Sequence, residues 1–248
     1  MTRRRIAGWF SGYRSALAHR DLRLLFGGLV TSATGTWAYN VSLLAFVFDR
    51  THSLGWVAAA GLSRFLPALL FSAYGGVVAE RLERIRLMMT SDLACAAWQV
   101  GLTLTAALSG PVVVALALAA LTAVSGVVYE PAVAATIPSI VDEDDLVAAN
   151  ALNSTIENLV VVVGPGIGAA LLALGSPALA FGVNAASFLV SAALVSRISI
   201  RSRPVDVTEA GGAGPLEQMK VGVRTIISLP AARTLVAYSA LVRDSTGG

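Results

Sequence analysis

Charged side chains are scarce in the apolar stretches of this 248-residue sequence, and the few that occur there are the first candidates for chemistry. Arg64 lies near the middle of one apolar run, Asp92 and Glu157 lie early in two others, and Glu130 ends a fourth. A charge held in hydrocarbon is costly, and by default it marks a substrate, ion or proton pathway. A structural pair buried between helices is the alternative for Arg64 and Glu157.

Polar and aromatic residues in the first apolar run extend this set. Trp37, Tyr39 and Asn40 could line a cavity together with Arg64, or they could simply pack between helices. Cys95 is the only cysteine, so the sequence holds neither an intramolecular disulfide nor a cysteine cluster for a metal. No nucleophile–base set stands out either. We therefore expect no enzyme, no metal, no cofactor and no nucleic-acid partner.

The elements that carry these residues are apolar and long. Hydrophobic residues make up 56% of the chain and charged residues 13%, where soluble domains have about 25% charged residues. Six apolar segments are each close to the length of about 20 residues that crosses a bilayer as a helix. We predict an all-α membrane protein whose six transmembrane helices fall at about 24–48, 54–79, 87–108, 112–128, 152–174 and 178–195.

The placement of basic residues predicts the orientation in the bilayer. Most lie in the N-terminal arm 1–23 and the connections 80–86 and 197–230, whereas the opposite short turns hold only Arg50. The positive-inside rule puts the former side, with the N-terminus, in the cytoplasm. The connection 129–150 is expected to be a further cytoplasmic loop. The predicted domains are the arm 1–23, a six-helix bundle 24–196, a cytoplasmic linker with an amphipathic helix 197–230, and a truncated seventh span 231–248.

Two motifs stand out between and within these spans. The connection after the second span reads Gly76-Val-Val-Ala-Glu-Arg-Leu-Glu-Arg-Ile-Arg86, in which the residues of interest are Gly76, Glu80, Arg81, Arg84 and Arg86. An ordinary positive-inside loop is the alternative. The second motif, Gly164-Pro165-Gly-Ile-Gly168, lies inside the fifth span, where small residues let helices pack closely and proline kinks the helix.

Together these motifs resemble the major facilitator superfamily of transporters. The first is similar to the superfamily's signature between spans two and three, and the second to a Gly-Pro-x-x-Gly motif taken to mark antiporters. The stretches Pro131–Pro138 and Phe181–Phe188 resemble the branch of the enterobactin exporter and the macrolide efflux pumps. The resemblance implies the N-terminal six-helix half of a proton-coupled exporter with alternating access.

The same resemblance implies partners and a place in the cell. These are the bilayer, a small amphiphilic substrate such as a drug or siderophore, and a second six-helix half, in a bacterial cytoplasmic membrane. In this family an acid at the position of Glu130 can pair with the basic loop, so Arg81 or Arg84 is its expected partner. The family often carries an arginine for proton exchange in the fourth span, and 117–125 contains none. A non-transporting or partial half-transporter remains the alternative function.

Overall fold

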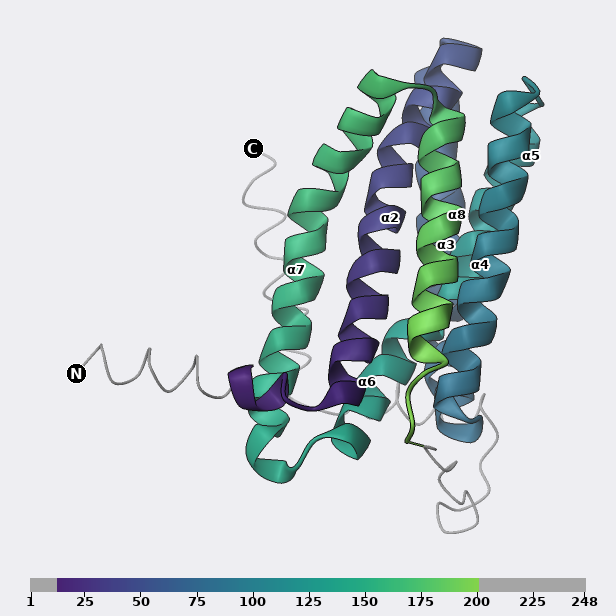
Figure 1. The fold of residues 1–248 in the computed structure, drawn as a ribbon. Coiled ribbons are helices and arrows are strands. Elements are labelled where there is room, and N and C mark those ends of the chain that lie inside the picture. Colours follow the sequence, from purple (N-terminus) through teal and green to yellow (C-terminus); the bar gives the residue numbers. More distant parts are fainter. Residues whose placement is uncertain (1–12, 201–248) are drawn as a thin grey trace, which may run out of the picture. The chain divides into compact units, whose positions relative to one another are not determined.

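The described part of the chain is built of helices, without a strand, as the sequence predicted. The computed structural model describes residues 13–200, with side chains placed at all of them except 68 and 72–81. The helices of the bundle are α2 (Arg20–Thr51), α3 (Leu54–Arg81), α4 (Arg84–Ala107), α5 (Val112–Gly126), α6 (Tyr129–Ile140), α7 (Glu143–Leu174) and α8 (Pro177–Val195). The long helices run antiparallel to their neighbours along the chain and form a bundle, and α6 continues the span that α5 begins (Figure 1).

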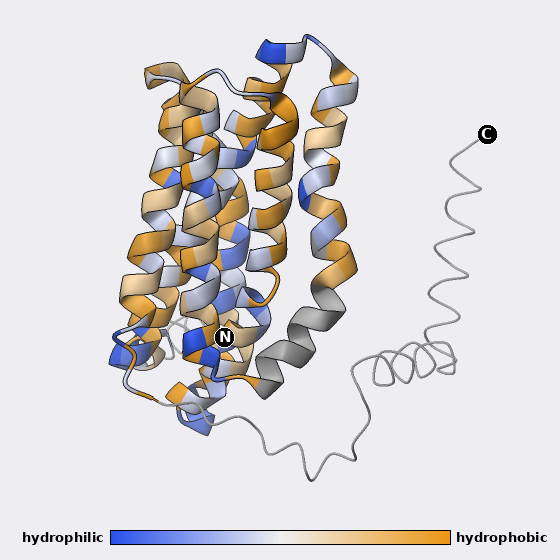
Figure 2. Ribbon diagram, turned by 90° about the vertical axis from the view of Figure 1, so that its right-hand side faces the viewer, coloured by the Kyte–Doolittle hydropathy of each residue, from blue (hydrophilic) through white to orange (hydrophobic). Residues whose placement is uncertain are grey.

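The lengths and compositions of these helices suit a bilayer. Among the described residues, four segments are long and apolar enough to cross it: Leu54–Phe71, Val112–Ile140, Glu143–Leu174 and Pro177–Val195. Helices α2 and α4 are less apolar, because they carry polar side chains such as Ser32, Ser42, Asp92 and Gln99 that are buried inside the bundle. Figure 2 shows apolar residues along the helices, interrupted by hydrophilic positions. The polar side chains of α2 and α4 thus face protein.

Glycine contacts hold α2 close to α7 and α8. A Cβ atom built on Gly35 of α2 would lie 2.3 Å from Ser187 Oγ and 2.5 Å from Asn184 Oδ1, both on α8. A Cβ on Gly168 of α7 would lie 2.4 Å from the carbonyl oxygen of Ala38 in α2. Such distances leave no room for a side chain, so these glycines set how closely the helices approach.

The predicted loop 129–150 is wrong. Helix α6 occupies Tyr129–Ile140 and α7 begins at Glu143, so only Val141 and Asp142 connect them. Pro131 and the acids of this segment lie where helices accept them, whereas Pro138 lies inside α6. Pro131 is in the first turn of α6, where its missing N–H is not needed. The acids Glu143, Asp144 and Asp145 form the first turn of α7, where the helix dipole favours negative charge.

The turn between the second and third predicted spans is also shorter than expected. Helix α3 continues to Arg81 and α4 starts at Arg84, which leaves Leu82 and Glu83 as the turn. The tight turns expected on the other side are present at His52–Ser53, Leu108–Pro111 and Gly175–Ser176. His52 and Ser109 adopt the left-handed conformation there, with φ of 48° and 57°.

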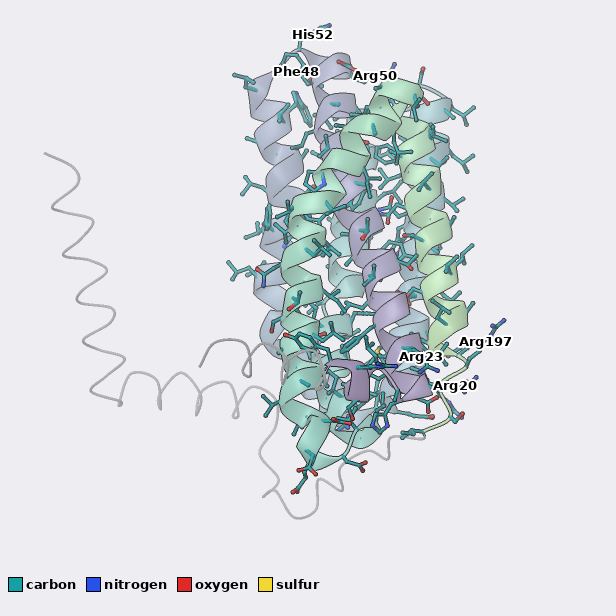
Figure 3. All side chains as sticks on the ribbon, turned by 60° about the vertical axis from the view of Figure 1, so that its left-hand side comes forward. Arg20, Arg23, Phe48, Arg50, His52 and Arg197 are labelled. Atoms are coloured by element: carbon teal, nitrogen blue, oxygen red, sulfur yellow. The ribbon has the colours of Figure 1, made fainter. Side chains whose placement is uncertain are left out.

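The two ends of the bundle differ in their arginines. Arg20, Arg23 and Arg197 lie together at one end, and Arg50 lies at the other beside His52 (Figure 3). Arg50 donates hydrogen bonds to the carbonyl oxygens of Ser109 and Gly110, and so joins two turns of its end. The arm 1–12 and the predicted linker and seventh span, 201–248, lie outside the described residues.

Candidate functional site

A cavity of about 360 Å³ opens between the helices. Most of the polar residues singled out in the sequence for such a role line it: Trp37, Tyr39, Arg64, Asp92 and Glu130. They come from four different helices, α2, α3, α4 and α6, so only the tertiary fold brings them together. The remaining lining residues are Leu29, Ser32, Ala33, Thr36, Phe65, Ser91, Cys95, Thr122, Ala123, Gly126, Val127, Tyr129 and Phe188.

One part of the wall is cationic and aromatic. The guanidinium carbon of Arg64 lies 4.8 Å from the ring centroid of Trp37 and 5.1 Å from that of Phe65. At these distances the ring faces attract the cation. Tyr39 is 1% exposed and meets Phe181 of α8 edge to face, with ring centroids 6.3 Å apart. The rings therefore form a rigid apolar wall around a single positive charge.

The other part of the wall is acidic and hydrogen-bonded across three helices. Ser191 Oγ of α8 donates to Asp92 Oδ2 of α4 at 2.6 Å. The hydroxyl oxygens of Tyr129 and Ser191 lie 3.0 Å apart. Ser191 has a single hydroxyl hydrogen, so Tyr129 is the donor to Ser191 while Ser191 donates to Asp92. Asp92 is 1% exposed, and the chain of hydroxyl groups links its carboxyl group to α6 and α8.

Glu130 lies in the first turn of α6, just after the break that separates α5 from α6. Its side chain is exposed and borders the cavity. Arg84 of α4 donates from Nη1 to the carbonyl oxygen of Ala135 in α6, 2.7 Å away. The ion pairs found among residues with described side chains do not include one between Glu130 and Arg84; they join His19 with Asp145, Arg20 with Asp21, and Arg86 with Glu83.

Two of the residues expected at a cavity, Glu157 and Asn40, are not among those that line this one. Glu157 is on an exposed face of α7, where it accepts a hydrogen bond from Asn153 Nδ2 at 2.7 Å. Asn40 is on α2, and its Nδ2 atom is buried without a hydrogen-bond partner among the described groups.

The glycine motif of the fifth span contacts the cavity through α2. A Cβ on Gly164 would lie 2.3 Å from the Cβ of Trp37, the residue that stacks on Arg64. Gly168 meets the backbone of Ala38 one turn further on, and Pro165 lies between them in α7. The motif therefore packs directly behind one wall of the cavity.

The basic motif lies at the junction of α3 and α4. Gly76, Glu80 and Arg81 belong to the last turns of α3. Arg86 is largely exposed, and its Nε atom lies 2.8 Å from Glu83 Oε2. Together with the Arg84 contact to α6, this places the motif at one end of the bundle.

Sequence reasoning missed Ser191 and Tyr129, which complete the polar network around Asp92. A serine in the last span has the pattern of a small packing residue, and Tyr129 stood at the edge of a predicted loop. The one available signal was that Asp92 is costly inside a membrane and requires hydrogen-bond donors on neighbouring helices.

Comparison with known proteins gives a consistent set of relatives. Residues 11–222 match the family described as "Transmembrane secretion effector". The enterobactin exporter of Shigella boydii serotype 18 is 30% identical over 231 residues, which cover 90% of this chain and 53% of that protein. The proposed bacilysin exporter of Bacillus amyloliquefaciens is 30% identical over 204 residues, covering 82% of this chain and 50% of that protein.

Solved structures show the same fold. A peptide transporter crystallised with alafosfalin superimposes with a TM-score of 0.63 at 16% identity, over 87% of this chain and 46% of that chain. A second crystal structure of the transporter, with sulfate, gives a TM-score of 0.60. The chain thus spans about half the length of the curated relatives and structures that it matches.

Proposed function

Because this chain belongs to the transmembrane secretion effector family of the major facilitator superfamily, we propose that it exports a small amphiphilic molecule across the bacterial cytoplasmic membrane. The observation that carries the proposal is the cavity of about 360 Å³, whose apolar and aromatic walls hold Arg64, Asp92 and Glu130. Ligand cavities of transporters lie between helices and combine apolar walls with a few placed polar groups. The drug- or siderophore-sized substrate named by the resemblance suits a pocket of this kind.

The transport cycle that we propose is alternating access. The helices α2, α3, α4, α5 with α6, α7 and α8 would make six spans, one half of a transporter, and a second six-helix half would close the cavity. Two features support a missing wall: the chain spans about half of its relatives, and cavity residues such as Phe65 and Glu130 are exposed on this half. Rocking of the two halves would then open the cavity to each side in turn.

Proton antiport is the proposed energy source, with Asp92 as the proton carrier. Buried carboxyl groups facing a membrane cavity are typical of proton relays. In the present arrangement Ser191 donates to Asp92 and accepts from Tyr129. Protonation of Asp92 gives it a hydroxyl hydrogen of its own, so the direction of both hydrogen bonds can reverse without any movement of the helices.

The proposed orientation places the arginine-rich end of the bundle in the cytoplasm. Arg20, Arg23 and Arg197 lie at that end, and Arg50 at the opposite end (Figure 3). Positive residues are retained on the cytoplasmic side. A cysteine in place of His52, with Cys95 replaced by alanine, should react with a membrane-impermeant maleimide in intact cells. A cysteine in place of Ser15 should react only after the cells are permeabilised. The reverse pattern would refute the proposed orientation.

The export proposal is tested in everted membrane vesicles from cells that express the chain together with the second six-helix half, with bacilysin and enterobactin as probes. Uptake above that of vesicles without the chain, abolished when the proton gradient is collapsed, is the expected result. Asp92→Asn should lower that uptake at least tenfold, because an amide carries no exchangeable acid proton. Asp49→Asn, an exposed acid outside the cavity, is the matched control and should leave uptake unchanged.

Two outcomes would count against the proposal. If uptake persists in Asp92→Asn with unchanged dependence on the proton gradient, Asp92 is not the carrier. If the wild-type chain moves neither probe even when the second half is present, the alternative of a non-transporting half takes its place.

A further inference from the structure

Arg64 carries a positive charge at the cavity, and among the residues with described side chains it has no anionic partner. Arg64 lies within Leu54–Phe71 of α3, a segment apolar enough to cross the membrane. Its guanidinium carbon lies over the ring of Trp37 and over that of Phe65, 4.8 Å and 5.1 Å from their centroids. Stacking engages the faces of the group and leaves the N–H bonds, which point outward in its plane, available.

Other arginines of the bundle use their N–H groups. Arg20 donates to the Arg197 carbonyl at 3.3 Å, and Arg84 to that of Ala135 at 2.7 Å. Arg23 and Arg50 likewise donate to backbone carbonyl oxygens. Within residues 13–200 as the structure describes them, Arg64 makes no hydrogen bond and no ion pair, although it is half-buried. Arg64 is also among the residues that line the cavity.

The acids of the cavity do not neutralise Arg64. Arg64 comes ten residues after Leu54 at the Arg50 end of α3, and Asp92 comes fifteen residues before Ala107 at the same end of α4. With a rise of about 1.5 Å per residue, they lie roughly 15 Å and 22 Å from that end. Asp92 is also engaged by Ser191. The cavity therefore has its positive charge nearer one end and its acids nearer the other.

We propose that Arg64 forms an anion-recognition subsite, so that the exported molecule carries a carboxylate, phosphonate or similar planar or tetrahedral anion on an apolar or aromatic body. The guanidinium fork matches such groups with paired hydrogen bonds. Trp37 and Phe65 hold the fork in place and present apolar surface beside it for the rest of the molecule. The inference rests on the proposed export function, since it names the chemical class of substrate for the same cavity.

The test is a binding measurement with two probes that differ only in charge. The 248-residue chain is placed in nanodiscs of phosphatidylcholine, and equilibrium dialysis measures its affinity for radiolabelled 2-naphthoate and its neutral isostere 2-naphthamide. The wild-type chain should bind the naphthoate at least tenfold more tightly. Arg64→Gln should abolish this preference and leave the amide affinity within twofold. Arg14→Gln, an exposed arginine far from the cavity lining, is the control and should keep the preference.

A second variant distinguishes the loss of the subsite from a general loss of folding. Arg64→Lys keeps the charge but loses the planar fork, so it should weaken naphthoate binding about threefold to tenfold and spare the amide. An equal loss for both probes in both variants would mean that Arg64 is a packing residue. A wild-type chain without charge preference would likewise overturn the subsite.

Repeating the measurement in nanodiscs with an anionic lipid distinguishes a bound lipid headgroup from a small anionic substrate. If phosphatidylglycerol in the nanodisc removes the naphthoate preference, Arg64 binds a lipid headgroup and the substrate assignment is wrong. If the preference persists there, the site selects the small anion. The export proposal is judged separately: charge preference without proton-driven uptake would refute export but not the subsite, and uptake without charge preference would refute only the subsite.

Discussion

The contact between Gly168 and α2 permits a direct test of how α2 and α7 pack in the bundle. Replacing Gly168 by alanine adds a Cβ atom 2.4 Å from the carbonyl oxygen of Ala38. Carbon–oxygen contacts between packed helices are about 3.3–3.6 Å long, so α2 and α7 must separate locally by about 1 Å. Overpacking of this kind typically costs about 1–3 kcal/mol. Because the atom in the way belongs to the backbone, no side-chain rotation can relieve the clash.

The same helix provides the matched control. A Cβ on Gly166 meets nothing within 4 Å, so Gly166→Ala has only the general effect of exchanging glycine for alanine in a helix, a gain of about 1 kcal/mol. That gain is common to both variants and cancels in their comparison. Gly168→Ala should therefore be less stable than Gly166→Ala by about 1–3 kcal/mol. At about 2–4 °C per kcal/mol, the difference in Tm is roughly 2–12 °C.

Cys95 supplies the assay. It is the only cysteine of the chain and is 1% exposed, between α4 and its neighbours. Cys95 borders the cavity but is buried, so its labelling by a bulky thiol-reactive fluorophore in detergent should accelerate as the bundle opens, and a thermal ramp gives an apparent Tm for each variant. If Gly168→Ala opens no earlier than Gly166→Ala, then α2 and α7 do not pack through these glycines, and the position of Trp37 would need revision.

Two further predictions concern the walls of the cavity. Ser191→Ala leaves Asp92 and Tyr129 without their shared partner and should lower the free energy of unfolding by about 1–3 kcal/mol, which the Cys95 assay detects as a lower apparent Tm. Ser191→Thr keeps the hydroxyl group and should recover most of that stability. Equal Tm values for the two variants would argue against the network. Gly164→Ala places a Cβ atom 2.3 Å from the Cβ atom of Trp37. It should therefore weaken 2-naphthoate binding at least threefold in the dialysis assay. An unchanged affinity would show that Trp37 does not support the cavity.

Most helices could be predicted from the sequence because long apolar runs have few alternatives in a membrane protein. The errors lie where polar residues continue a helix beyond its apolar part. The predicted loop 129–150 contained the acids at 143–145, which begin α7, and Pro131, which fits the first turn of α6. Composition identifies the segment that suits hydrocarbon, but helix ends depend on local hydrogen bonding, which composition does not report.

The site could be predicted in part for a related reason. Arg64 and Asp92 were identified because a charge in an apolar run is conspicuous, and both line the cavity. Glu157 was equally conspicuous, yet it lies on an exposed face of α7, because the direction of a side chain depends on how the helices pack. Ser191 and Tyr129 carry no charge, and their importance arises only from the atoms that the fold places beside them.

Helix α3 differs from the others in how little it contributes to the core of this bundle. Among its residues with described side chains, Ala60 alone is fully buried, whereas α8 buries residues along its whole length. Yet α3 carries Arg64 and Phe65, which meet the cavity. Substitutions on this helix can thus alter what the cavity accepts while the core that maintains the fold is unaffected. With such a division, we expect related proteins to differ in substrate through changes on α3, and to keep the glycine contacts of α2.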